Sequence, residues 1–119
     1  MSAANPSDRE VETAGELLKA LSAPVRLRVV AELSRGPRCV HELTDVVGAS
    51  QSLLSQHLRV LRGAGLVRSS RRGREIEYTL ADEHVAHIVW DAIHHAEHAV
   101  EDRPGTHADA GDVHERPES

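Results

Sequence analysis

Aromatic residues and cysteine are nearly absent from this sequence. Its 119 residues include one Trp, one Tyr and no Phe, so the core must be built from Leu, Val and Ala. A single cysteine, Cys39, excludes an internal disulfide and fits a reducing compartment. No apolar run reaches membrane-spanning length, and the N-terminus lacks the basic-then-apolar pattern of a signal peptide. We therefore expect a cytoplasmic protein with no membrane partner.

Enzyme signatures are also missing. His41-Glu42 is not followed by the second His of the zinc-protease motif HExxH. The sequence contains neither a glycine-rich phosphate loop nor a nucleophile elbow. We therefore do not expect an enzyme.

Charge is distributed unevenly along the chain. Residues 1–49 carry a net charge of −1, residues 50–80 of +4 and residues 81–119 of −8. The basic residues of the middle segment are all arginines, which makes this segment a candidate phosphate-binding surface. Seven of the nine His residues lie in the acidic last segment, beside carboxylates that could act as further metal ligands.

One small domain over residues 8–101 is expected. Residues 1–7 are small and polar, and residues 102–119 form an acidic, His-containing tail interrupted by Pro and Gly, so we expect both to be disordered. Ser7 and Glu10 match a capping box that opens a first helix. Ser22 is expected to cap a second helix that has Pro24 in its first turn.

The next segment predicts a helix-turn-helix. A short helix over residues 40–47 should end at Gly48, and Ser50 should cap a helix over residues 51–62. In this motif the second helix enters the DNA major groove. Leu54, Leu58 and Leu61 form its expected buried stripe. Because Gln can read adenine and Ser several base edges, its polar residues are candidate DNA contacts: Gln51, Ser52, Ser55, Gln56 and Arg59.

A β-hairpin is predicted directly after this recognition helix. Strands over residues 66–70 and 75–80 flank the turn Arg71-Arg72-Gly73-Arg74. Arginines at such a tip suit a wing that grips the DNA backbone or minor groove. The alternative is a solvated turn in which Arg serves only solubility. The predicted fold class is therefore mainly α with a β-hairpin wing, a winged helix-turn-helix.

Two pairs of candidate metal ligands lie on one predicted helix over residues 82–98, with Asp82 as N-cap. Asp82 and His84 stand at its start, and His95 and His98, three residues apart on one face, lie near its end. His84 and His95 are roughly 16 Å apart at ~1.5 Å per residue, too far to share a metal. Two antiparallel copies across a two-fold axis would bring the pairs together twice per dimer. One oxygen and three nitrogens suit tetrahedral zinc or cobalt.

Other interpretations stay open at this point. His87 and His94 share a face through Asp91 and offer a competing site within one helix. His107 and His114 could be surface residues, or could join the four ligands in a six-coordinate nickel or cobalt site. The protein could instead be a metal-independent winged-helix regulator acting through Cys39 or a partner protein, or a His-rich metal buffer.

Several motifs resemble the ArsR/SmtB family of winged-helix metal-sensing repressors, over about residues 17–98. They are LKALSAPVRLRVVAEL, CVHEL, SQSLLSQHLRVLRGAGLV, GREIEYTL and DEHVAHIVWDAIHHAEH. The actinobacterial SmtB-type zinc sensors look most similar. The resemblance implies a homodimer formed through the N- and C-terminal helices. It also implies a repressor that binds double-stranded operator DNA without metal and leaves it when zinc binds.

The resemblance also assigns individual residues. Asp82, His84, His95 and His98 fall on the family's four C-terminal-helix ligand positions, and Arg72 and Arg74 match the wing tip. Gln51, Ser52 and Ser55 fall on its DNA-contacting face. Gln56 stands where many relatives have His, and His57 where they have Gln, so either residue could reach a base. Without Cys or His before Cys39, the family's second metal site is expected to be vestigial. Cys39 is then expected to be a small apolar residue.

Overall fold

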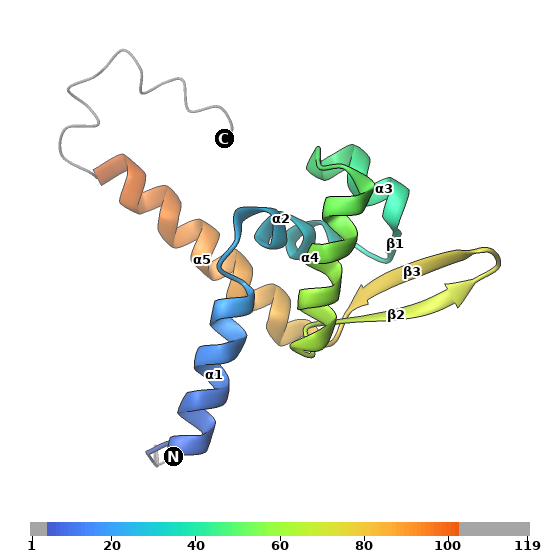
Figure 1. Cartoon of the computed structure of the whole chain (residues 1–119). Coiled ribbons are helices and arrows are strands. Elements are labelled where there is room, and N and C mark those ends of the chain that lie inside the picture. Colours follow the sequence, from blue (N-terminus) through green and yellow to red (C-terminus); the bar gives the residue numbers. More distant parts are fainter. Residues whose placement is uncertain (1–4, 103–119) are drawn as a thin grey trace. The chain divides into compact units, whose positions relative to one another are not determined.

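Within residues 5–102, five helices and three short strands form the predicted winged helix-turn-helix, although only two of the strands were predicted. The computed structural model describes residues 5–102. In chain order the elements are α1 (Asp8–Ala20), α2 (Pro24–Leu33), β1 (Arg38–Cys39), α3 (Val40–Val47), α4 (Gln51–Gly63), β2 (Val67–Arg72), β3 (Glu75–Leu80) and α5 (Glu83–Asp102) (Figure 1). The described chain forms two units, divided after Val89 within α5. Across residues 5–102, no helix is long and apolar enough to cross a membrane.

The capping box predicted for α1 is confirmed. The Glu10 backbone N–H donates to Ser7 Oγ at 3.1 Å, and the Ser7 N–H donates to Glu10 Oε1 at 3.0 Å. These two bonds satisfy two backbone donors that have no partner inside the helix. Ala20 is nevertheless the one buried residue of α1. The helix is therefore well started by its own sequence but packed only at its last turn.

The predicted cap of α2 is wrong. Ala23, and not Ser22, is the N-cap residue, and the Ser22 hydroxyl donates instead to the Lys19 carbonyl at 2.8 Å. Pro24 explains the shift, since the residue before a proline is driven into extended backbone, which is the conformation of an N-cap. Ala23 adopts it with φ −91° and ψ 134°. Pro24 does occupy the first turn, as expected.

A core of Leu and Val lies within the unit that ends at Val89. The predicted stripe of α4 is confirmed, with Leu54, Leu58 and Leu61 all buried. The other buried residues beyond α1 are Leu21, Val29, Val30, Leu33, Leu43, Leu66, Val67, Val85 and Val89. Each fully buried side chain of this kind contributes about 1.5–3 kcal/mol. This core joins α2, α3 and α4 to the base of the wing and the first turns of α5.

The hairpin is longer than predicted, and a third strand joins it. Arg71 and Arg72 belong to β2 and not to the turn, and Arg72 is opposite Glu75 in the register. Only Gly73 and Arg74 remain as the connection, where Gly73 has a φ of 66° that favours glycine. β1 was not predicted, and its two residues pair antiparallel with β3 in the order β1-β3-β2. Figure 1 shows β2 and β3 running out together from the end of α4.

Asp82 caps α5 as predicted. Its Oδ1 accepts the backbone N–H of His84 at 2.9 Å and of Val85 at 3.3 Å. The carboxylate also places a negative charge at the helix N-terminus, where it is favourable. α5 then continues to Asp102. The metal-ligand candidates therefore lie at the start and in the second half of one helix.

Candidate functional site

The outer face of α4 presents most of the polar residues predicted to contact DNA. Gln51, Ser52, Gln56 and Arg59 are exposed, and Ser55 is half-buried. Ser50 caps the helix, since its Oγ accepts the Leu53 backbone N–H at 3.1 Å. The same turn therefore starts the helix and leaves its first side chains accessible. This placement is the one a helix needs to insert its N-terminal end into a major groove.

His57, which was also predicted to contact DNA, makes a contact inside the domain. It is half-buried, and its Nδ1 lies 3.0 Å from Nη1 of Arg26 on α2. Burial, and then the charge of Arg26, lower the pKa of His57 below its ordinary value. Its neighbour Gln56 remains exposed. Gln56 and His57, either of which could reach a base according to the sequence, thus have different surroundings.

The wing places its arginines on and beside the turn. Arg74 is exposed in the two-residue connection. Arg72 is exposed too, but its Nη1 donates to Glu77 Oε2 at 3.0 Å. Arg62 at the end of α4 donates to Ser69 Oγ of β2 at 3.1 Å. This bond ties the recognition helix to the wing, so the two basic elements are linked by a side-chain contact.

The first candidate ligand pair lies at the N-terminus of α5. His84 Nδ1 is 3.5 Å from Asp82 Oδ1, and the side chains are 89% and 58% exposed. Both capping bonds use Oδ1, so Asp82 Oδ2 accepts no hydrogen bond from the described residues. A carboxylate oxygen and an imidazole of this kind are acceptable zinc donors. The pair is therefore compatible with a metal and incomplete by itself.

The second candidate pair, His95 and His98, is exposed on α5 three residues apart. The ring of the neighbouring His94 packs against Trp90, with centroids 5.8 Å apart. Within residues 5–102, no three His, Cys, Asp or Glu side chains of one chain form a group that could hold a metal. The competing set of His87, Asp91 and His94 is therefore not assembled as a site. His107 and His114 lie outside the described residues.

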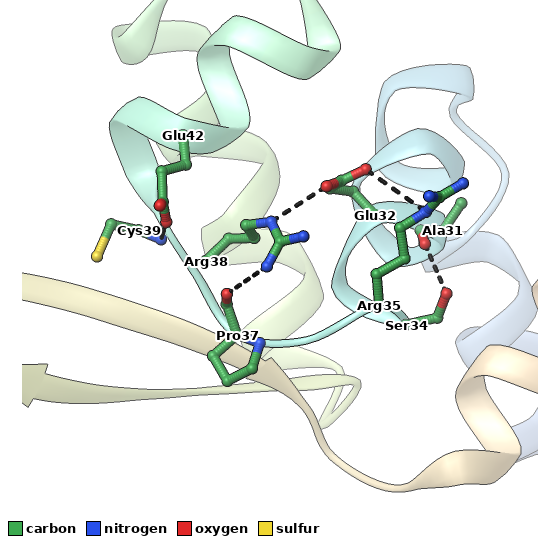
Figure 2. Close-up of polar contacts among 8 residues, drawn as sticks. All are labelled: Ala31, Glu32, Ser34, Arg35, Pro37, Arg38, Cys39 and Glu42. Atoms are coloured by element: carbon green, nitrogen blue, oxygen red, sulfur yellow. Dashed lines mark hydrogen bonds and ion pairs between the residues drawn. The ribbon is translucent and has the colours of Figure 1, made fainter.

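Cys39 lies at the junction of β1 and α3 beside acidic residues. Its backbone N–H donates to Glu42 Oε1 at 2.8 Å, while its thiol points away from the ion pair of Glu32 and Arg38 at 3.1 Å (Figure 2). A hydrogen bond to Glu75, desolvation and nearby carboxylates raise the pKa of the thiol to about 11. The thiolate, which is the form that binds metal and reacts, is therefore disfavoured.

Three side chains that shape this site escaped the sequence interpretation. Arg26 contacts His57 in the middle of α4, and Arg62 near the end of α4 contacts Ser69 of β2. Leu53 was missed because a Leu in an amphipathic helix is normally assigned to the core, yet it is 43% exposed on the recognition helix. One signal was available, namely that Arg26 and Arg28 interrupt the apolar run PVRLRVV, because a cation that packs inside such a run needs a partner.

Comparison with known proteins agrees with this geometry. The family model described as bacterial regulatory protein, arsR family, matches residues 23–69. The HTH-type transcriptional repressor SmtB of Mycobacterium tuberculosis is 54% identical over 92 residues, which is 76% of this chain and 68% of that protein. The transcriptional regulator NmtR of the same species is 47% identical over 81 residues, 68% of each chain.

A solved structure extends the match to the fold. The homodimeric winged helix-turn-helix DNA-binding domain from Mycobacterium bovis, described as a possible ArsR-family regulator, superposes with a TM-score of 0.69. It is 28% identical and covers 85% of this chain and 97% of that one. These relatives are described as transcriptional regulators and not as enzymes. The chain belongs to the arsR family of bacterial regulatory proteins.

Proposed function

We propose that this protein is a dimeric transcriptional repressor that binds operator DNA without metal and leaves it when zinc binds. The observation that carries the proposal is a pair of exposed His residues, His95 and His98, on one face of the helix that follows a complete DNA-reading domain. Such a pair satisfies half of a tetrahedral site. The similarity to SmtB supports the repressor role.

Dimerisation is supported by apolar side chains that have no cover in one chain. Val11 and Leu18 on α1, at 56% and 55%, are the two most exposed large apolar side chains among the described residues. Burying one such side chain stabilises an interface by about 1.5–3 kcal/mol. A two-fold dimer buries every contributing residue twice. These two side chains favour an interface that includes α1, and the shared metal site would add α5.

The metal site in this proposal is shared between subunits. Asp82 and His84 of one chain would join His95 and His98 of its partner, giving one oxygen and three nitrogens, twice per dimer. Bound zinc would supply a cross-link between the two α5 helices. Asp82 keeps its capping role through Oδ1 while Oδ2 serves as donor. A coupling of about 1–3 kcal/mol is sufficient to release an operator, and by linkage bound DNA weakens metal binding equally.

On the DNA side, we assign base contacts to Gln51, Ser52, Ser55 and Gln56 of α4. Arg59, Arg72 and Arg74 are assigned to phosphates or the minor groove. Arg72 contributes less than Arg74, because its guanidinium must first give up part of its ion pair with Glu77. Affinity should accordingly fall steeply with salt concentration.

Fluorescence anisotropy on the protein's own upstream DNA, at fixed salt, tests the proposal. Zinc should weaken binding of the wild-type protein by about 5- to 150-fold. His95→Ala and Asp82→Ala should bind the same DNA with wild-type affinity and lose the response to zinc. His94→Ala and His87→Ala are matched controls, because they remove an exposed His from the same helix without touching the four assigned ligands.

Other outcomes identify the alternatives. Binding that no metal changes would contradict the metal-sensing part and leave a metal-independent regulator. Release by nickel or cobalt alone, lost when residues 104–119 are removed, would favour a six-coordinate site that uses His107 and His114. Absence of salt-dependent DNA binding would reject the repressor and favour a metal buffer.

A further inference from the structure

The Arg26 side chain joins three helices. Its Nε donates to the carbonyl oxygen of Ala20, the last residue of α1, at 2.6 Å. Its Nη1 lies 3.0 Å from Nδ1 of His57 on α4. Arg26 itself stands in the first turn of α2 and is half-buried. One rigid guanidinium thus connects the end of α1, the start of α2 and the middle of the recognition helix.

The direction of the bond to His57 defines the state of the imidazole. A guanidinium carries only donors and stays protonated in proteins, so Nδ1 of His57 must accept. The ring is therefore neutral, with its proton on Nε2. The lowered pKa of His57, caused by burial and by the Arg26 charge, independently favours the same neutral form. Geometry and electrostatics agree on one protonation state.

This bond bears on the rotation of α4 about its own axis. Apolar packing of Leu54, Leu58 and Leu61 places the helix, but hydrophobic contact is non-directional. A helix with side chains has a radius of about 5–6 Å, so a 10° rotation moves its outer atoms by about 1 Å. Base-reading hydrogen bonds tolerate only about 0.5 Å in length. A directional hydrogen bond at His57, such as the one to Arg26, would therefore set the orientation of Gln56 on the outer face of α4.

We infer that Arg26 is a positioning residue for base recognition, which holds His57 inward so that Gln56 faces the DNA. The inference rests on the proposed DNA-reading role of α4. It predicts that loss of the bridge affects sequence-specific binding and spares non-specific binding, because phosphate contacts by the wing arginines do not depend on the rotation of α4. A purely structural role would weaken both kinds of binding together.

The test compares two arginines of the same helix. Arg28 is exposed on α2 and makes neither of these contacts, so Arg28→Ala removes the same charge as Arg26→Ala without removing the bridge. A high-affinity duplex is first selected from a random pool with the wild-type protein. Affinities for this duplex and for a scrambled duplex then give a specificity ratio. We expect Arg26→Ala to lower the ratio by about tenfold or more, as for a hydrogen bond to a charged group, and Arg28→Ala to leave it unchanged.

Two variants of His57 distinguish an effect on the orientation of α4 from an effect on the stability of the fold. His57→Asn keeps an acceptor near the position of Nδ1 and should retain the ratio within about twofold. His57→Leu removes the acceptor and should lose the ratio as Arg26→Ala does, and the double variant should be no worse than either single one. Substituting 7-deaza-adenine in the selected duplex should weaken the wild-type protein and have little effect on Arg26→Ala, since Gln reads adenine N6 and N7.

Each result has one meaning. An unchanged ratio in folded Arg26→Ala or in His57→Leu overturns the inference and leaves the repressor proposal standing. If Arg26→Ala shows no cooperative thermal unfolding, it is not folded. The specificity ratios of His57→Leu and His57→Asn then test the inference. A wild-type protein that selects no duplex from the pool contradicts the proposed function itself, and the inference with it.

Discussion

The DNA-reading region and the terminal helices meet their chemical requirements in different ways. Within residues 24–80, arginines bond to other residues of the same unit, and the leucine stripe of α4 is buried. In α1 only Ala20 is buried, and α5 after Val89 is at most half-buried. The core and these polar contacts of the first region are thus completed within one chain, while Val46, Leu53 and Val60 stay exposed on its surface. The second has the most exposed apolar side chains and the candidate ligands, which in the proposed dimer meet a second copy.

This difference shows where a single chain suffices. A DNA-binding surface must keep the orientation of its side chains whether or not the effector is bound. Its contacts are therefore made within one unit. A sensor needs groups that change partners when the effector arrives, so leaving them exposed in one chain is consistent with a switch at the subunit interface.

The largest expected effect is on the free energy of unfolding, when a core side chain of the DNA-reading region is removed. Leu58→Ala should lower the free energy of unfolding by about 2–5 kcal/mol, because the side chain is fully buried and a cavity would remain. Leu53→Ala on the same helix should cost no more than about 0.5 kcal/mol, as expected for a surface position. Urea unfolding followed by circular dichroism measures both. Equal losses would contradict the assignment of Leu58 to the core and of Leu53 to the surface.

The next effect concerns the terminal helices and the dissociation constant of the proposed dimer. Leu18→Glu should weaken the dimer by about a hundredfold or more, because each two-fold interface loses two buried Leu side chains and gains two charges. Val46→Glu, on α3 and 49% exposed, is the matched control and should leave the dimer intact. Sedimentation equilibrium measures the dissociation constant. An unaffected Leu18→Glu dimer would place the interface elsewhere.

A smaller effect is expected from protonation of His57. Because its pKa is lowered in the folded state, the unfolded chain binds this proton more readily. Stability attributable to His57 is therefore lost as the pH falls from the ordinary pKa of 6.5 toward the lower folded value. His57→Asn should remove this part of the pH dependence, measured by urea unfolding between about pH 7.5 and pH 5. An identical slope in both proteins would contradict the assigned neutral ring.

The smallest effect is expected at Cys39. With a pKa of about 11, its thiol is almost entirely protonated at neutral pH, so iodoacetamide should label the folded protein far more slowly than the unfolded one. Glu75→Gln should speed labelling, because the hydrogen bond to Glu75 is the largest cause of the raised pKa. Cys39→Ala should leave DNA binding and the zinc response unchanged. A lost response would revive a role for the second metal site.

Local signals predicted the elements well. Ser7, Ser50 and Asp82 cap the helices that they were expected to cap, because a capping bond joins residues only two or three positions apart. Ser22 failed because the adjacent Pro24 imposed its own backbone requirement. β1 was missed because two residues carry too little periodicity, and only its partner β3, far along the chain, makes it a strand.

By itself, the sequence determined the helix-turn-helix, the leucine stripe, the basic wing and the ligand pairs, since each depends on helical or strand spacing. The different surroundings of Gln56 and His57 were decided by tertiary structure. The two residues are adjacent and both polar, and only the approach of Arg26 from α2 makes one an internal acceptor and leaves the other exposed. Spacing fixes the face on which a residue lies, whereas the groups that meet that face depend on how distant segments pack.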